Sequence, residues 1–212
     1  MTIRHHLSEP LLMAYAAGTL PEAFGLVVAS HITMCDECRA SLAGFEAVGG
    51  AVMEDVGEVA LAEGSLDSVL ARLSPPDRRP IIAKRAGTLP TPLMDYIGGD
   101  LSAIKWRSLG MGVKQAILPT DSKASARLLF IPAGQAVPDH GHRGTELTLV
   151  LQGAFSDSSD RFAPGDLEIA TEDFQHTPVA EAGADCICLA ATDAPLRFKG
   201  LLPRLLQPLF RI

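Results

Sequence analysis

Apolar residues recur at helical spacing through the first third of the chain. In the first such stretch Leu11, Leu12 and Tyr15 share one helical face, and Ser8-Glu9-Pro10 before them is typical of a helix start. The same spacing continues in three further stretches. The four predicted helices run from Ser8 to Gly18, Pro21 to His31, Cys38 to about Val56 and Ser65 to Leu73. Residues 1–74 are therefore predicted to form a small helical domain.

After residue 92 the apolar pattern changes to the period of a β-strand. Between Ile104 and Ser108 apolar and charged side chains alternate, and strand-like runs follow at residues 127–131, 146–151 and 186–191. Glycine and proline turns separate these runs at short intervals. This pattern is typical of antiparallel β-barrels and sandwiches. We therefore predict an all-β domain over residues 93–196, and a multidomain α + β protein.

A proline-rich segment lies between the two patterns. Five of the 15 prolines fall within residues 74–92, where they exclude a helix and favour extended backbone. Residues 75–92 are therefore predicted to be a linker that lets the domains be separated without cutting a core. Prolines also interrupt the apolar residues of segment 197–212, which we expect to pack on the protein as a C-terminal tail.

The net charge of -7 is concentrated in the helical domain. Residues 1–74 carry ten acidic side chains and three arginines, whereas residues 75–212 carry fifteen of each sign. An acidic domain repels nucleic acid and favours a basic protein partner, although an acidic face retained for solubility fits the charge equally well. The apolar runs are far shorter than the ~20 residues of a membrane span. We expect neither direct nucleic-acid binding nor a membrane contact.

The four cysteines form two close pairs. Cys35 with Cys38 and Cys186 with Cys188 suit metal or thiol chemistry in a reducing compartment better than a disulfide framework. Because no signal peptide is recognisable either, a cytoplasmic location is expected. Cys186 and Cys188 share one face of a predicted strand, where they are either small core residues or an oxidant-sensitive pair.

The six histidines fall into two clusters, and the first surrounds a cysteine pair. His31, Cys35 and Cys38 follow one another at offsets of four and three residues, which place side chains on one face of a helix. Two thiolates and an imidazole select zinc over hard cations. A fourth tetrahedral position remains, which His5 or His6 could fill from the N-terminal segment.

The second cluster resembles the first cupin motif, Gly-x5-His-x-His-x3-Glu-x6-Gly. Its residues are Gly134, His140, His142, Glu146 and Gly153. The offsets from His140 to Glu146 are even, so one extended strand would point these ligands to one side. Pro164-Gly165-Asp166, followed by His176, resembles the second cupin motif. Three imidazoles and one carboxylate could hold zinc, iron, manganese or nickel.

The order of these features resembles a known family. A histidine at position 6, followed by His31-x3-Cys35-x2-Cys38 in an acidic helical domain, is similar to the zinc-binding anti-sigma proteins. With a cupin-like domain after it, the chain resembles the ChrR-type anti-sigma factors. The resemblance implies His6 as the fourth ligand, zinc with two ions per chain, and binding of a group IV (extracytoplasmic-function) sigma factor through residues 1–74. It also implies release of that factor on exposure to singlet oxygen or organic hydroperoxide, a response that requires the cupin part.

A cupin metalloenzyme, dioxygenase-like and carrying an accessory zinc domain, is the alternative interpretation of the same ligands. The sequence offers no obvious acid–base residue beyond the ligands themselves, so a regulator rather than an enzyme is expected.

Overall fold

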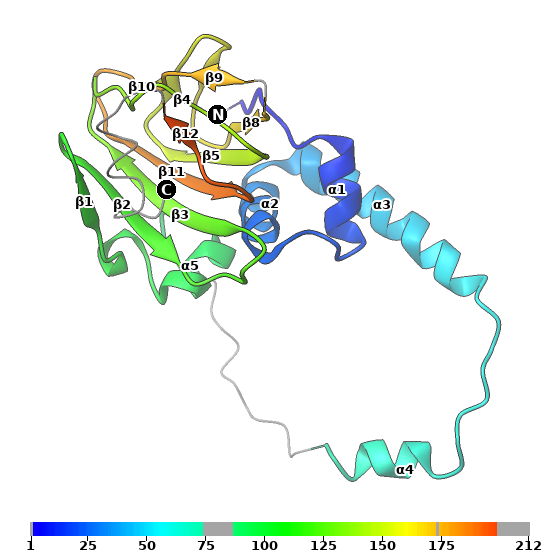
Figure 1. Cartoon of the computed structure of the whole chain (residues 1–212). Helices are drawn as coiled ribbons and strands as arrows, with labels where there is room; N and C mark the ends of the chain where they lie inside the picture. Colours follow the sequence, from blue (N-terminus) through cyan, green and yellow to red (C-terminus); the bar gives the residue numbers. More distant parts are fainter. Residues whose placement is uncertain (1, 74–86, 173, 199–212) are drawn as a thin grey trace.

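The computed structural model describes residues 2–172, apart from 74–86, and residues 174–198. The helices are α1 (Glu9–Ala16), α2 (Glu22–Met34), α3 (Asp36–Glu54), α4 (Ser65–Leu70) and α5 (Thr91–Ile97), with a 3-10 turn at Leu101–Ala103 (Figure 1). The strands are β1 (Arg107–Gly110), β2 (Val113–Leu118), β3 (Ser125–Ile131), β4 (His140–Gly141), β5 (Glu146–Gln152), β6 (Phe155–Ser156), β7 (Arg161–Phe162), β8 (Leu167–Ala170), β9 (Gln175–His176), β10 (Val179–Ala180), β11 (Cys186–Thr192) and β12 (Arg197–Phe198).

The strands form one large sheet and two small ones. The large sheet has six strands in the order β1-β2-β3-β11-β5-β8, and the small sheets have the orders β10-β6-β7 and β12-β4-β9. Every pair of neighbouring strands is antiparallel. The predicted change from helices to an antiparallel β domain is therefore confirmed. The tail predicted from residue 197 contributes only β12, and residues 199–212 lie outside the described part.

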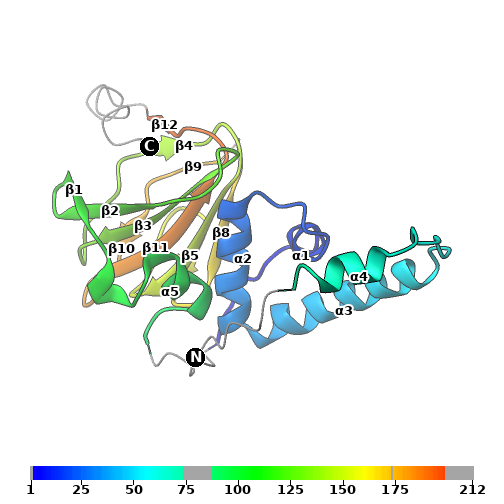
Figure 2. The same ribbon diagram turned by 90° about the horizontal axis from the view of Figure 1, so that it is seen from below.

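The large sheet has a polar face and an apolar face, which follow from alternation along its central strands. On β5, Leu147 and Leu149 point one way and pair in register with Ala191 and Leu189 of β11. Thr148 lies on the opposite face. Helix α2 lies against β3, β5 and β11 (Figure 2). The apolar face of the sheet is thus covered by a helix from the other end of the sequence.

This contact joins the two predicted domains in one core. A single buried apolar cluster includes Leu12 and Val27 from the helices together with Leu128 and Leu189 from the sheet. The expectation that the helical domain separates without cutting a core is therefore wrong. Apolar periodicity shows which face of an element is buried, but it does not show which surface covers it. The linker boundaries at residues 75–92 stay a prediction, because residues 75–86 are not described.

Helix α5 begins at Thr91, within the last two residues of the predicted linker. Pro90 is extended and precedes the helix, and Pro92 occupies its first turn. Proline is tolerated there because the first N–H groups of a helix have no intrahelical partner. Gly98 ends α5 in the left-handed conformation with φ 72°. Leu93 on α5 is buried in the shared core, so α5 and α2 pack together.

The third and fourth helices are much more exposed than a packed four-helix domain would be. In α3 the buried residues are Cys38 and Leu42, and α4 has none. In the described part of the chain, ten of the fifteen exposed large apolar side chains lie between Val48 and Leu73. We call residues 46–73 the α3–α4 arm. Figure 1 shows this arm leading away from the sheet.

The shared core predicts that a sheet mutation destabilises the helices. Leu189→Ala removes a fully buried side chain from the sheet face that α2 covers, and we expect a cost of ~2–5 kcal/mol. Hydrogen exchange of the full-length protein should show faster exchange in α2 as well as in β11. Met13→Ala, at a 55% exposed position of α1, should change stability by less than ~0.5 kcal/mol. Unchanged α2 protection in Leu189→Ala would contradict the shared core.

Candidate metal centres

The first centre forms where α2 gives way to α3. His31 lies in the last turn of α2, Cys35 is the N-cap of α3, and Cys38 lies in its first turn. Cys35 is extended, with φ -116° and ψ 108°, so the predicted continuous helical face is interrupted here. The ligands still converge, because the Cys35 side chain folds back to accept the backbone N–H of Cys38, with N···Sγ 3.4 Å.

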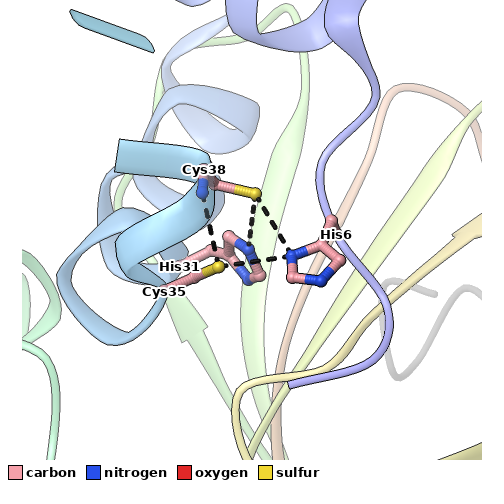
Figure 3. A group of neighbouring side chains, drawn as sticks. All are labelled: His6, His31, Cys35 and Cys38. Carbon is pink, nitrogen blue, oxygen red and sulfur yellow. Dashed lines mark hydrogen bonds between the residues drawn. The ribbon is translucent and has the colours of Figure 1, made fainter. Parts of the chain in front are cut away.

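His6 completes this group from the N-terminal segment. Its Nδ1 lies 3.3 Å from Sγ of Cys35 and 3.7 Å from Sγ of Cys38, and Nε2 of His31 lies 3.3 Å from Sγ of Cys38 (Figure 3). Ligand atoms at the corners of a tetrahedron around zinc are ~3.3–3.8 Å apart, given zinc–ligand distances of ~2.0–2.3 Å. The observed separations match that spacing, so the four side chains are arranged as a metal site.

His5 is directed elsewhere, so the geometry groups His6 rather than His5 with His31 and the two cysteines. Its Nε2 lies 3.1 Å from Oδ2 of Asp160, and its ring packs on Phe162 with centroids 4.4 Å apart. His6 instead has Nε2 3.5 Å from Oε2 of Glu37 while Nδ1 faces the thiols. A carboxylate behind a ligating imidazole is the usual outer partner in metal sites.

The electrostatics of the first centre suit a cation. Burial, together with the neighbouring His6, lowers the pKa of His31 to about 4, so this imidazole is neutral and able to ligate. Burial also raises the pKa of the Cys38 thiol to about 11, so a metal ion bound here would have to displace the thiol proton. Two sulfurs and two nitrogens in a buried tetrahedral set are the donors that zinc prefers.

The second centre brings together three histidines from two short strands. His140 on β4 pairs directly with His176 on β9, and His142 follows β4. The Nε2 atom of His176 lies 3.1 Å from Nε2 of His140 and 3.4 Å from Nε2 of His142. Edges of ~3.0–3.4 Å are expected between nitrogens bound to one ion at ~2.1 Å. These predicted ligands therefore converge.

Glu146 does not join the converging nitrogens. The chain bends at residues 143–144 and enters a different sheet, so His140, His142 and Glu146 do not share one strand as predicted. The carboxylate of Glu146 stands behind His142, with Oε2 3.2 Å from Nδ1. Burial raises the pKa of Glu146, but the three histidines outweigh it and the net shift is downward, so the group is charged. Whether Glu146 also ligates an ion stays a prediction.

An oxygen atom lies within 3.2 Å of Nδ1 on each of the three imidazoles, and hydrogen bonds at Nδ1 orient His140 and His176. His140 Nδ1 donates to the carbonyl of Pro138 at 2.8 Å, and Nδ1 of His142 faces Glu146. An imidazole whose Nδ1 carries the proton presents a lone pair at Nε2. The three Nε2 atoms face one another in a buried space and could hold one shared cation. The donor set therefore fits a metal ion.

Two carboxylates that the sequence analysis missed hold His176. Its Nδ1 lies 2.7 Å from Oδ2 of Asp157 and 3.0 Å from Oε1 of Glu168. Burial raises the pKa of Glu168 to about 7, whereas the pKa of Asp157 is lowered, because hydrogen bonds from Ser159, Glu168 and His176 outweigh its burial. The sequence does carry one sign of this role, because Glu168 is the single acidic residue within the otherwise apolar strand β8.

Cys186 and Cys188 lie apart from both centres. Their sulfurs are 3.5 Å apart, and both residues are buried in a second apolar cluster with Ile131, Val150 and Phe155. The hydrogen bond with Cys186 and burial raise the pKa of the Cys188 thiol. The burial of both residues among apolar side chains supports the interpretation as core residues. In the described segments no helix is long and apolar enough to cross a membrane.

The described fold is a helical module, with a His/Cys group that could hold a metal ion, built onto a cupin-type β domain. The family model of the ChrR cupin-like domain matches residues 95–195. The chain is 64% identical over 213 residues to the anti-sigma-E factor ChrR of Cereibacter sphaeroides, covering 100% of both proteins. A crystal structure of Rhodobacter sphaeroides SigE in complex with the anti-sigma ChrR matches with TM-score 0.81 and 62% identity, over 91% of this chain and 100% of that one. The chain belongs to the ChrR family of anti-sigma factors.

The first centre predicts different effects for the adjacent histidines. Because Nδ1 of His6 faces both thiols and His5 faces Asp160, His6→Ala should weaken metal binding at least about tenfold and His5→Ala should leave it within about threefold. Titration with cobalt(II), followed by thiolate-to-cobalt absorption, reports this centre selectively. Equal losses in the two variants would show that the ligand is misassigned.

Proposed function

We propose that this protein is an anti-sigma factor that holds a group IV sigma factor away from RNA polymerase through residues 1–74. On exposure to singlet oxygen or organic hydroperoxide it releases that factor, and the cupin domain is needed for the response. Membership of the ChrR family supports this function, since one relative is named an anti-sigma-E factor and another is seen in complex with SigE. Because sigma factors act on RNA polymerase, the proposal places the protein in the cytoplasm.

The exposed apolar surface of the α3–α4 arm carries the proposal. Val48 and Val52 of α3, and Val56 just after its end, recur every fourth residue and are 63–69% exposed. Such spacing places them along one side of the helix and its end. An apolar stripe of this kind without a covering surface is typical of a protein–protein contact. A metalloenzyme acting inside the cupin domain has no use for such an arm.

The second part of the arm repeats the pattern. Leu66, Leu70 and Leu73 recur at offsets of four and three residues and are 52–67% exposed. Six acidic side chains and one arginine accompany these apolar residues within the arm. The arm therefore fits an apolar groove with a basic rim, which is the helix-in-groove mode of recognition. Binding to such a partner should weaken as salt is added.

The two metal centres have separate roles in this proposal. Zinc bound by His6, His31, Cys35 and Cys38 would fix the junction of α2 and α3, from which the arm extends. A second ion, zinc being our first choice, would be held in the cupin domain by the three histidines with Glu146. Such an ion supplies a Lewis acid and a site for oxidant chemistry. The protein's own contribution is the fixed Nδ1 partners and the burial of each imidazole.

The arm can be tested with charged substitutions on its apolar stripe. The double variant Val52→Asp/Leu66→Asp should lower affinity for purified SigE of the Rhodobacter sphaeroides complex at least about hundredfold, because carboxylates would be desolvated in the contact. Both positions are exposed, at 63% and 67%, so folding should be unaffected. Met111→Asp, at a 76% exposed apolar position in the β1–β2 turn, is the control. Undiminished binding by the double variant would exclude the arm as the contact.

The cupin centre should serve the response and not the inhibition. Alanine at any of its predicted ligands should remove one of two ions per chain by elemental analysis and should blunt the oxidant response of a sigma-dependent reporter. These ligands are His140, His142, Glu146 and His176. Reporter output before stress should stay low, because the arm is untouched. High output without stress would assign inhibition to the cupin domain, and a full response in all four variants would remove its metal from sensing.

A further inference from the structure

A single buried carboxylate fastens the N-terminal segment to the cupin domain. Oδ1 of Asp166 accepts the backbone N–H of Arg4 at 2.6 Å and that of His5 at 3.0 Å. Its Oδ2 accepts the N–H of Ala163 at 2.9 Å, within its own turn. Asp166 is only 2% exposed. The next residue of the N-terminal segment is His6, a ligand of the first centre.

The charge of this carboxylate is stabilised by the groups it holds. Burial alone would raise the pKa of Asp166, but the N–H groups of Ala163, Arg4 and His5 outweigh it and lower the pKa. Hydrogen bonds to an ionised acceptor are stronger than those between neutral groups. Asp166 is therefore a strong attachment point for the two N–H groups that precede His6.

Further contacts surround the same attachment. The carbonyl of His5 accepts the N–H of Leu167 at 3.2 Å. Gly165 has φ 91°, and a Cβ there would lie 2.6 Å from Cδ1 of Ile3, so the N-terminal segment approaches the turn too closely for another side chain. The same turn also acts on the first centre electrostatically, because the backbone of Gly165 and the charge of Asp166 raise the pKa of His31 against the larger lowering by burial and His6.

The same turn leads directly to the second centre. Residues 163–168, which we call the clamp turn, run from the hydrogen-bond partner of Asp166 into β8. Glu168 lies two residues after Asp166 and contacts Nδ1 of His176 at 3.0 Å. Glu168 pairs in register with Thr148 of β5, on the polar face of the large sheet. Two side chains of one short segment thus contact the N-terminal segment beside His6 and a histidine of the cupin centre.

We propose that the clamp turn couples the two metal centres, with Asp166 positioning His6 for its metal and Glu168 positioning His176 for the other. A change at the cupin centre would then reach the first centre through six residues of chain, 163–168, rather than through the whole shared core. This proposal rests on the proposed function, since it names the route between sensing and the junction that carries the arm. Asp166 and Glu168 are positioning residues in this scheme.

The Asp166 end is tested by metal release from the full-length protein. Cobalt(II) is the probe, because thiolate-to-cobalt absorption reports the centre with Cys35 and Cys38. In Asp166→Asn we expect a chelator to remove this cobalt about tenfold faster than in the wild type, because the neutral amide accepts the two N–H groups more weakly. Hydrogen exchange at Arg4 and His5 should accelerate in parallel.

Two further variants make this test decisive. Arg4→Pro deletes one N–H donor and leaves every barrel side chain in place, so it tests the contact even if Asp166→Asn fails to fold. The matched control is Asp185→Asn, whose carboxylate accepts the N–H of Ala133 at 3.0 Å elsewhere on the β domain, and whose release rate should stay within about twofold of wild type. Wild-type release from both Asp166→Asn and Arg4→Pro would overturn the proposal.

The coupling itself requires a double-mutant cycle. Glu168→Gln keeps the size of the side chain but changes its contact with His176, and should accelerate cobalt release from the first centre about threefold. In the Asp166→Asn background the same substitution should have no further effect. No acceleration by Glu168→Gln, or equal acceleration in both backgrounds, would overturn the coupling.

Binding of SigE by the same proteins separates this proposal from the proposed function. A wild-type chain that shows the coupling but does not bind SigE would reject the anti-sigma function and leave the coupling in place. A wild-type chain that binds SigE normally but shows no coupling would reject the coupling and leave the anti-sigma function in place.

Discussion

Helix α2 lies with its apolar side on β3, β5 and β11, and this contact fixes the positions of both metal centres. Its last turn carries His31, and the residue that ends it leads straight into the Cys35 N-cap. The opposite face of the same sheet carries Thr148 and Glu168, the latter in contact with His176. The sheet is therefore the common support of the two sites, with one on each side. The clamp turn leads into β8 of this sheet and contacts both the N-terminal segment beside His6 and His176 of the cupin centre.

The ligand residues of the helical module are buried, whereas the apolar side chains of the α3–α4 arm are exposed. The helical module buries His31, Cys35 and Cys38, while the α3–α4 arm that follows keeps nearly all of its apolar side chains in solvent. Metal binding at the junction would set the direction in which α3 leaves the core. An arm whose origin is fixed and whose apolar surface is free loses less conformational entropy when a partner covers it. This arrangement suits a protein whose task is to be bound tightly and then released.

Much of this structure is predictable from local patterns. The starts of α2 and α4, the change to antiparallel strands, and the convergence of His31 with the two cysteines follow from periodicity, capping residues and ligand spacing. The choice of His6 over His5 did not follow from physics, because adjacent residues differ only in the direction that the backbone gives them. Glu146 was expected on one strand with the histidines, and the bend at residues 143–144 placed it behind His142. Asp157, Asp166 and Glu168 were missed because their partners lie far away in sequence.

The exposed arm is the feature on which the functional account depends, and hydrogen exchange with and without SigE tests it most directly. The full-length, metal-loaded protein would be compared alone and in complex. We predict slowed exchange across residues 46–73, from amides that exchange rapidly in the free protein, and little change in β3, β5 and β11. Protection concentrated in the β domain, with the arm still exchanging freely, would contradict the account.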